Sequence, residues 1–177
     1  MSVTIRRELQ SDVAAIDALI VSAFLHARHT SHSEKFIVKA LREAKQLSVS
    51  LVAENKGDHV GHVAVSPVSI SNGTEHWSGL GPIAVTPEWQ GQGVGSALME
   101  QALTELQKLG AAGCVVLGET QYYGRFGFKA EPGLVVSDVL TEYFQAMPFG
   151  AQVPAGTVAY QEAFHAQGQQ SIRPDAP

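Results

Sequence analysis

The first third of the chain passes from a strand-like to a helix-like pattern of apolar residues. Residues 3–8 alternate as a half-buried strand does, and Ser11 and Asp12 then offer side-chain oxygens that can cap a helix. Two stripes of helical period follow, one on each side of the polar segment 29–33: Ile16, Leu19, Ile20, Ala23 and Phe24, then Phe36, Ile37, Ala40, Leu41 and Ala44. The pattern predicts a strand followed by two helices.

The middle of the chain reads as strands joined by tight turns. Residues 48–54, 59–66 and 77–85 are rich in β-forming residues, and Asn55–Asp58 and Asn72-Gly73 supply turn residues between them. Because short turns join antiparallel neighbours, these segments predict an antiparallel meander.

A long helix is predicted from Gly93 to Gly110. Its apolar stripe is Val94, Leu98, Ala102, Leu106 and Leu109, and Gly110 suits a left-handed cap. Residues 112–118 then form a continuous apolar run, typical of a central strand covered on both faces. A strand, a helix and a strand in this order predict a right-handed crossover between parallel strands. A short helix at 122–126 and strands near Phe128, at 143–147 and at 157–160 complete the pattern.

Composition favours one globular domain. The chain has 177 residues, of which 45% are hydrophobic and 16% are charged, so it can bury a core and does not resemble a disordered chain. The order of elements predicts an α+β fold. We predict a single domain over residues 1–165 and a flexible tail over 166–177, where Gln, Gly and Pro dominate.

Charge and cysteine content restrict partners and compartment. The net charge of −5 leaves no broad cationic face for nucleic acid. The single cysteine, Cys114, has no partner for an intramolecular disulfide, and the first residues lack the apolar run of a signal peptide. No stretch reaches the roughly 18 apolar residues of a membrane span. We therefore expect a cytoplasmic protein that contacts neither nucleic acid nor membrane.

The segment from Val85 to Ser96 carries the candidate chemistry. It runs from the end of a strand through a Gly-rich turn into the long helix, where amide groups without intrahelical partners can converge on an anion such as phosphate. A Walker loop is excluded because the turn has no Lys. A dinucleotide-binding fingerprint is excluded because Leu98 stands at the position where that pattern requires a third Gly or an Ala. The pattern that matches is Gln-x-x-Gly-x-Gly, at Gln90, Gly93 and Gly95.

This pattern resembles the acetyl-CoA signature of the GCN5-related N-acetyltransferase (GNAT) superfamily. A second motif, Tyr123 to Phe128, is similar to that superfamily's later signature, and with Gly118-Glu119 it resembles the YhbS-like bacterial branch. The resemblance covers residues 2–164. It implies a mixed central sheet, an antiparallel meander plus a parallel splayed pair, flanked by helices.

The resemblance also implies how acetyl-CoA binds. The backbone amides of residues 92–96 would hold the pyrophosphate, and Gln90 and Gly91 would shape the turn. The Ser96 hydroxyl would be free to add a bond. The residues expected to bind the cofactor are Ile83, Ala84, Val85, Gln90, Gly91, Gln92, Gly93, Val94, Gly95 and Ser96. Gly81-Pro82 interrupts a central strand, so we expect a bulge or splay there, with the pantetheine arm in the gap beside Ile83, Ala84 and Val85. One of these amides would face the thioester oxygen.

Two residues are candidates for proton transfer. An amine attacks only in its neutral form, so a group must accept its proton. Glu119, at the end of the apolar strand, is the candidate base. The alternatives are that Glu119 is a solvated loop residue or a cap for the next helix. Tyr123 matches the position of the acid that protonates the CoA thiolate, while Tyr122 is more typical of packing.

Other candidate residues favour ordinary roles. His26, His29 and His32 lack a carboxylate at ligand spacing, so no metal is expected; they more often form a polar lip or a solvated surface. His59 and His62 differ by an odd number on a strand and should point to opposite faces. Cys114 is typical of a buried structural cysteine, and Trp89 could cover the cofactor or anchor the turn.

The predicted function is acetyl transfer from acetyl-CoA to a primary amine by direct attack in a ternary complex. The acceptor, a small molecule or a peptide, is not specified by the residues of its expected site, 26–33 and 143–156. The alternatives are a non-catalytic CoA-binding sensor and an acyltransferase that acts on a protein amine. The resemblance also implies that homodimers are common, although this chain shows no signature of one.

Overall fold

The computed structural model describes residues 2–27, 32–150 and 152–168. A seven-stranded sheet, in the order β1-β2-β3-β5-β6-β9-β7, forms its centre. The strands are β1 (Thr4–Arg7), β2 (Val49–Asn55), β3 (Asp58–Pro67), β5 (Trp77–Val85), β6 (Gly113–Leu117), β9 (Phe144–Pro148) and β7 (Lys129–Ala130). The helices are α1 (Val13–Phe24), α2 (Glu34–Glu43), α3 (Val94–Lys108) and α4 (Thr120–Gly124). Within the described ranges, no helix is long and apolar enough to span a bilayer.

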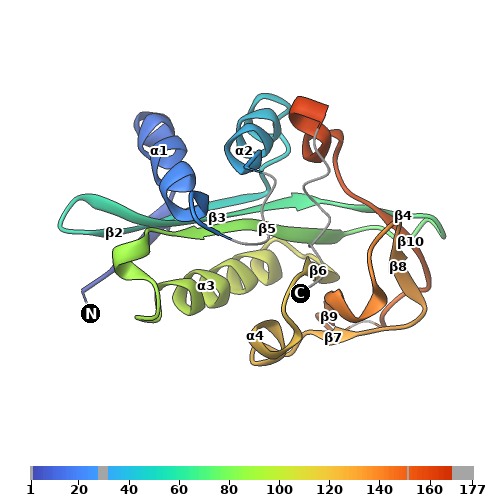
Figure 1. Ribbon diagram of the computed structural model, residues 1–177. Coiled ribbons are helices and arrows are strands. Elements are labelled where there is room, and N and C mark those ends of the chain that lie inside the picture. The colour runs from blue at the N-terminus through green and yellow to red at the C-terminus, as the bar shows by residue number, and fades with distance from the viewer. Residues whose placement is uncertain (1, 28–31, 151, 169–177) are drawn as a thin grey trace.

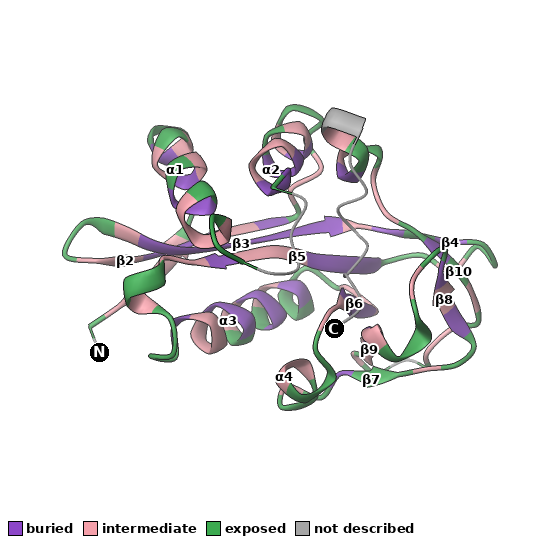
Figure 2. Cartoon of the chain, in the orientation of Figure 1, coloured by how far each residue is buried: buried purple, intermediate pink, exposed green. Residues whose placement is uncertain are grey.

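Helices cover both faces of the sheet (Figure 1). Helices α1 and α2 pack on one face and α3 packs on the other. The purple segments of Figure 2 follow the middle strands and the inner stripe of α3, where Leu98, Met99 and Ala102 are fully buried. The predicted meander is confirmed, because β2, β3 and β5 pair antiparallel. Gly110, with φ +84°, adopts the predicted left-handed conformation after α3.

The parallel pair β5 and β6 is splayed as expected. The two strands pair only over Trp77–Gly79 of β5, although β5 continues to Val85. On the other side of β5, Val63 lies opposite Ile83 and Val65 lies opposite Leu80, so β5 carries one extra residue at Gly81-Pro82. This bulge turns the second half of β5 away from β6 and opens a gap between them.

A second, three-stranded sheet was not anticipated from the sequence. It consists of β4 (Ser69–Ile70), β10 (Gly156–Ala159) and β8 (Leu134–Val136), and β10 is the strand predicted at 157–160. After β10, a 3-10 helix, η4 (Glu162–Gly168), lies beside α2 (Figure 1). The structure thus gives regular backbone to the first residues of the predicted tail, and residues 169–177 of that tail lie outside the described ranges.

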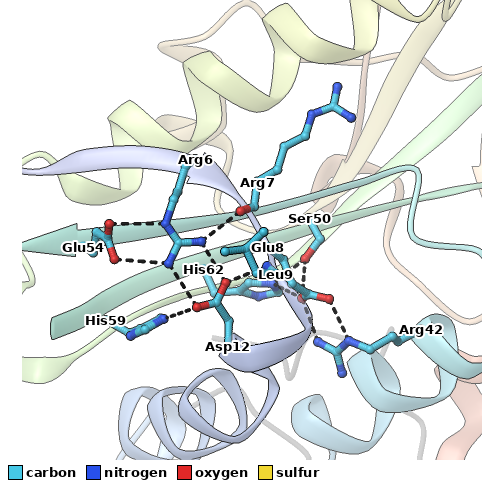
Figure 3. A network of polar contacts seen from close by, with 10 residues as sticks. All are labelled: Arg6, Arg7, Glu8, Leu9, Asp12, Arg42, Ser50, Glu54, His59 and His62. Carbon is cyan, nitrogen blue, oxygen red and sulfur yellow. Dashed lines mark hydrogen bonds and ion pairs between the residues drawn. The ribbon is translucent and has the colours of Figure 1, made fainter. Parts of the chain in front are cut away.

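A network of ion pairs joins β1 to the start of α1 (Figure 3). Arg6 donates two hydrogen bonds to Asp12, at 2.8 and 3.0 Å, and two more to Glu54 on β2. The Asp12 carboxylate also accepts the backbone N–H of Leu9 at 2.6 Å and bonds to His59 at 2.8 Å. Asp12 precedes α1 as predicted, but its carboxylate makes these contacts instead of capping that helix.

A second part of the network anchors α2 to the sheet. Arg42 on α2 binds Glu8 through Nε and Nη2, both at 2.8 Å. Ser50 on β2 donates to Glu8 at 2.7 Å and lies 2.9 Å from Nε2 of the fully buried His62. Because Arg42 lies in the last turn of α2, this network fixes the C-terminal end of that helix on the sheet.

The prediction that His59 and His62 point to opposite faces is wrong. The register of β2 and β3 shifts between Ala53 and Glu54, so that Val52 pairs with His62 whereas Glu54 pairs with His59. The extra residue of β3 changes the alternation, and both imidazoles lie on the side of β1 and α1 (Figure 3).

Candidate active site

The Gly-rich loop lies between β5 and α3, as the sequence indicates. A single 3-10 turn, η2 (Pro87–Trp89), follows β5, and Gly93, with φ +87°, occupies the position before the first residue of α3. Residues 90–93 are exposed, so the amides at the start of α3 face a surface that solvent or a ligand can reach. Free amides at a helix N-terminus favour an anion.

Two glutamine side chains hold the loop by bonds to the backbone. Gln90 donates Nε2 to the carbonyl of Val85 at 3.0 Å, and Gln92 donates Nε2 to the carbonyl of Glu88 at 2.8 Å. Both side chains therefore bridge the turn to the chain that precedes it. Trp89 packs against the main core, as a residue that anchors the turn does, and it also lines the cavity at the loop. Its role as a cover of the cofactor stays a prediction.

Arg125, for which no role was expected from the sequence, brings a positive charge to this loop. Its Nη2 donates to Ser96 Oγ at 3.2 Å, and its guanidinium lies 4.8 Å from the ring centre of Tyr122. The Ser96 hydroxyl accepts this bond and keeps its own proton, so the bond to the cofactor expected from the sequence stays a prediction. The loop, Tyr122 and Arg125 line a cavity of about 340 Å³. The signal was present in the second motif, where Arg125 stands between Tyr123 and Phe126.

A second cavity, of about 240 Å³, lies at the splay between β5 and β6. Its described lining is Phe24, Glu34, Ile37, Leu80, Gly81, Pro82, Ile83, Leu117, Tyr123, Tyr160 and Phe164. Thus the bulged half of β5, the end of β6, α1, α2, α4 and the C-terminal segment all meet at this point. Of the residues that the sequence singled out, Ile83, Tyr123 and the Gly81-Pro82 pair lie here.

Tyr123 is held in this cavity by aromatic neighbours. Its ring packs edge-on against Tyr122 and Phe128, with centroids 5.0 and 6.1 Å apart, and its N–H bonds to the carbonyl of Glu119. Burial raises the pKa of the Tyr123 phenol well above its ordinary value, and Tyr122 and Cys114 add to that shift. The phenol therefore stays protonated at neutral pH and can act as a proton donor.

The two carboxylates near the cavity have different surroundings. Glu119 is exposed and takes the position before the first residue of α4, without a side-chain cap bond, and it is not part of the described lining. Glu34, at the first position of α2, is buried and lines the cavity. Sequence reasoning missed Glu34, since only the fold brings the start of α2 to the splay.

The structure describes two of the three clustered histidines and the single cysteine. His26 and His32 are exposed, and His29 lies outside the described residues. In the part of the chain that the structure describes, no group of three His, Cys, Asp or Glu could hold a metal ion. Cys114 is fully buried in β6, and burial raises the pKa of its thiol. It is therefore a structural thiol, not an activated nucleophile.

Comparisons with known proteins agree with this geometry. A model of the acetyltransferase (GNAT) domain matches residues 46–130, which include β2, the loop and α4. The uncharacterised N-acetyltransferase YhbS of Escherichia coli K12 is 37% identical over 126 residues, which are 71% of this chain and 72% of YhbS.

Two crystal structures resemble the whole fold. A GNAT family acetyltransferase from Brucella melitensis, in complex with acetyl-CoA, has a TM-score of 0.83 and 44% identity, and covers 92% of this chain and 98% of its own. YhbS from Escherichia coli, in complex with CoA, has a TM-score of 0.80 and 31% identity, and covers 92% of each chain. These matches confirm the predicted fold class.

Proposed function

The chain belongs to the acetyltransferase (GNAT) family, and we propose that it transfers an acetyl group from acetyl-CoA to a primary amine by direct attack in a ternary complex. The observation that carries the proposal is the position of Tyr123. It lies in the cavity at the splay, and its helix α4 also brings Tyr122 to the anion-binding loop. One short helix thereby serves both the cofactor's phosphates and its thioester.

The loop is the proposed site of the diphosphate of acetyl-CoA. The backbone amides of residues 92–96 donate to the phosphate oxygens, supported by the partial positive charge at the start of α3. Gln90 and Gly91 shape the turn, and Val94 buries its side chain beneath it. Arg125 adds a charge-assisted bond at the same cavity.

The gap beside β5 is the proposed site of the pantetheine arm. Ile83, Ala84 and Val85 pair with β3 along one edge, while β6 pairs with β5 only as far as Gly79. The other edge of residues 83–85 therefore has backbone groups that an extended amide chain can pair with. One of these amides is the proposed donor to the thioester oxygen, where negative charge develops during attack.

The chemical step requires two proton transfers. The amine nitrogen forms a bond to the acetyl carbon, and the carbon–sulfur bond breaks with its electron pair on sulfur. Tyr123 protonates the departing thiolate, and the nitrogen gives up one proton. We assign Glu119 as the acceptor of that proton through water, because it is exposed and follows Leu117 of the cavity wall by two residues. Glu119 then releases its proton to solvent and Tyr123 takes one from solvent, so the products are the acetamide and CoA and both side chains return to their starting states.

A thiol-release assay with acetyl-CoA and a panel of amines, amino acids and peptides tests this function. The proposal expects CoA release that depends on the amine and equals the acetamide formed. Tight CoA binding without turnover on any amine would instead identify a sensor. Turnover on peptides alone would identify an enzyme of protein amines.

A further inference from the structure

Tyr160 carries a buried hydroxyl that has no hydrogen-bond partner among the described residues. The residue follows the last position of β10 and lines the cavity at the splay, together with Tyr123. Buried hydroxyls nearly always make a hydrogen bond, and one that lacks a partner costs free energy. A ligand group in this cavity is therefore the natural partner of the Tyr160 hydroxyl.

The ring of Tyr160 is fixed at the place where β5 and β6 separate. Gly79 is the last residue of β5 that pairs with β6, and a Cβ on Gly79 would lie only 2.6 Å from Cε2 of Tyr160. The ring therefore lies against the backbone of Gly79, and Cε2 is bonded to the ring carbon that carries the hydroxyl. Phe164 packs edge-on against this ring at a centroid distance of 4.9 Å, and the neighbouring Gln161 donates Nε2 to the carbonyl of Pro67 at 2.9 Å. These contacts hold the hydroxyl at the inner end of the gap.

The part of acetyl-CoA that reaches this end of the gap is its acyl group. The proposed pantetheine arm runs along residues 83–85, away from the diphosphate at the start of α3. Its thioester then lies between that segment and Gly79. Tyr123, the proposed donor to sulfur, lines the same cavity. The thioester carbonyl is therefore the ligand group that the Tyr160 hydroxyl can reach.

Few hydrogen-bond donors are present at this end of the gap. Pro82 has no N–H, and Tyr123 and Tyr160 are the only hydroxyl side chains among the described residues that line the cavity. The proposed mechanism uses the proton of Tyr123 for the departing thiolate. Burial raises the pKa of the Tyr160 phenol, and Cys114 and Tyr123 raise it further, so this hydroxyl keeps its proton at neutral pH. Tyr160 thus remains as the side chain that can donate to the carbonyl oxygen.

We infer that Tyr160 is a catalytic residue that donates a hydrogen bond to the carbonyl oxygen of the thioester. This inference rests on the proposed acetyl transfer and adds a second donor to the backbone amide of residues 83–85. When the amine nitrogen bonds to the acyl carbon, the π electrons of the carbonyl move to oxygen, and both donors stabilise the negative charge there. These electrons form the C=O bond again as the carbon–sulfur bond breaks, and Tyr160 keeps its proton throughout.

The carbonyl stretch of bound acetyl-CoA measures this hydrogen bond without any acceptor amine. A hydrogen bond to a carbonyl oxygen lowers the stretching frequency, and a ¹³C label on the carbonyl carbon identifies the band in infrared difference spectra. Tyr160→Phe removes one oxygen and keeps the ring, so we expect it to raise the frequency relative to wild type. Equal frequencies in the variant and wild type would overturn the inference.

Ser66→Ala is the matched control for the loss of a buried hydroxyl. Ser66 lies opposite Gly79 on β3, and its buried Oγ also has no hydrogen-bond partner among the described residues. Unlike Tyr160, Ser66 is not part of the described lining of the cavity. Ser66→Ala should therefore leave the carbonyl frequency and kcat as in wild type. A shift in Ser66→Ala equal to that in Tyr160→Phe would overturn a specific role for Tyr160.

Kinetics with the amine of highest kcat/KM in the thiol-release panel give a second measurement. Loss of one donor to the oxyanion should lower kcat about 10²-fold in Tyr160→Phe. The dissociation constant of CoA, which has no acyl group, should stay unchanged in calorimetry. Urea unfolding without ligand should show equal or higher stability in the variant, because the hydroxyl it removes has no partner there. A raised KM for the amine, with unchanged kcat and carbonyl frequency, would assign the hydroxyl to the acceptor and overturn the inference.

The outcomes separate this inference from the function on which it rests. Normal amine acetylation by Tyr160→Phe, with an unshifted carbonyl band, would overturn the role of Tyr160 and leave acetyl transfer intact. Binding of acetyl-CoA by the wild type without turnover of any amine would overturn acetyl transfer, and the catalytic role of Tyr160 would fail with it.

Discussion

The hydroxyl of Tyr122 occupies the space that a side chain at position 95 would need. A Cβ on Gly95 would lie 2.8 Å from Tyr122 Oη, closer than such atoms approach in proteins. The tyrosine ring cannot move away easily, since Arg125 lies over it and Phe126 packs against it at a centroid distance of 5.5 Å. Gly95, the second residue of α3, is therefore needed for the contact with α4.

Gly95→Ala should destabilise the protein and weaken CoA binding in the same variant. Overpacking typically costs about 1–3 kcal/mol, which outweighs the roughly 1 kcal/mol that alanine gains over glycine inside a helix. Urea unfolding and CoA calorimetry measure both effects. In a Tyr122→Phe background the clash disappears, so the added alanine should then be neutral or stabilising. Equal destabilisation in both backgrounds would show that Tyr122 is not the cause.

Arg125→Ala should raise the dissociation constant of CoA about tenfold, the equivalent of 1.4 kcal/mol. The physical reason is loss of a charge-assisted bond at the phosphate loop, and Arg125→Lys should recover part of it. Acetyl-pantetheine, which lacks the diphosphate, is the control substrate. Its turnover should be unchanged in Arg125→Ala, and a parallel loss would indicate that Arg125 acts by holding α4 in place.

Tyr123→Phe should lower kcat by about 10²–10⁴, the usual contribution of a general acid, with little change in CoA affinity. Because burial raises the pKa of this phenol above its ordinary value of 10, wild-type kcat should not fall on the alkaline side before pH 10 through loss of this proton. Steady-state kinetics from pH 6 to 10 measure both effects. Equal kcat in variant and wild type would remove Tyr123 from the mechanism.

The network on the α1 and α2 side should make the fold sensitive to acid. Burial raises the pKa of Glu8, but bonds from Arg42, His62 and Ser50 outweigh it and leave that pKa well below 4.5. The bonds from Arg6 likewise lower the pKa of Asp12. A carboxyl with a lowered folded pKa stabilises the protein above its unfolded pKa, and this stability is lost as the pH falls below about 5.

Glu8→Gln tests this dependence. We expect a loss of about 1–3 kcal/mol in the free energy of unfolding at pH 7, and a shallower decline than wild type between pH 5 and 2. Glu43→Gln, in an exposed pair with Lys39, should cost under about 0.5 kcal/mol. If both variants lose the same free energy of unfolding, the Glu8 network stabilises the fold no more than an exposed ion pair does.

Local signals in the sequence predicted the backbone of the Gly-rich loop and of the bulged strand. The loop from Gln90 to Ser96 forms within one strand–helix unit, and the Pro82 bulge depends on the missing amide of proline, so neighbours in sequence were sufficient. The antiparallel meander and the splayed pair followed from the same kind of evidence.

The wall of the cavity at the splay depends on contacts between distant segments. Glu34 and Tyr160 come from α2 and from the end of β10, and only the packing of η4 beside α2 brings them together. The bulge of β3 reversed the expected direction of one histidine, because one extra residue changes the alternation of a strand. The short strands β4 and β8 have too few residues to show any period.

A crystal structure of the complex with CoA tests the central claim most directly. The account predicts diphosphate oxygens within hydrogen-bond distance of the amides of residues 92–96, pantetheine paired along residues 83–85, and the thiol beside Tyr123. A diphosphate bound away from the start of α3, or a thiol that points away from the cavity at the splay, would contradict it.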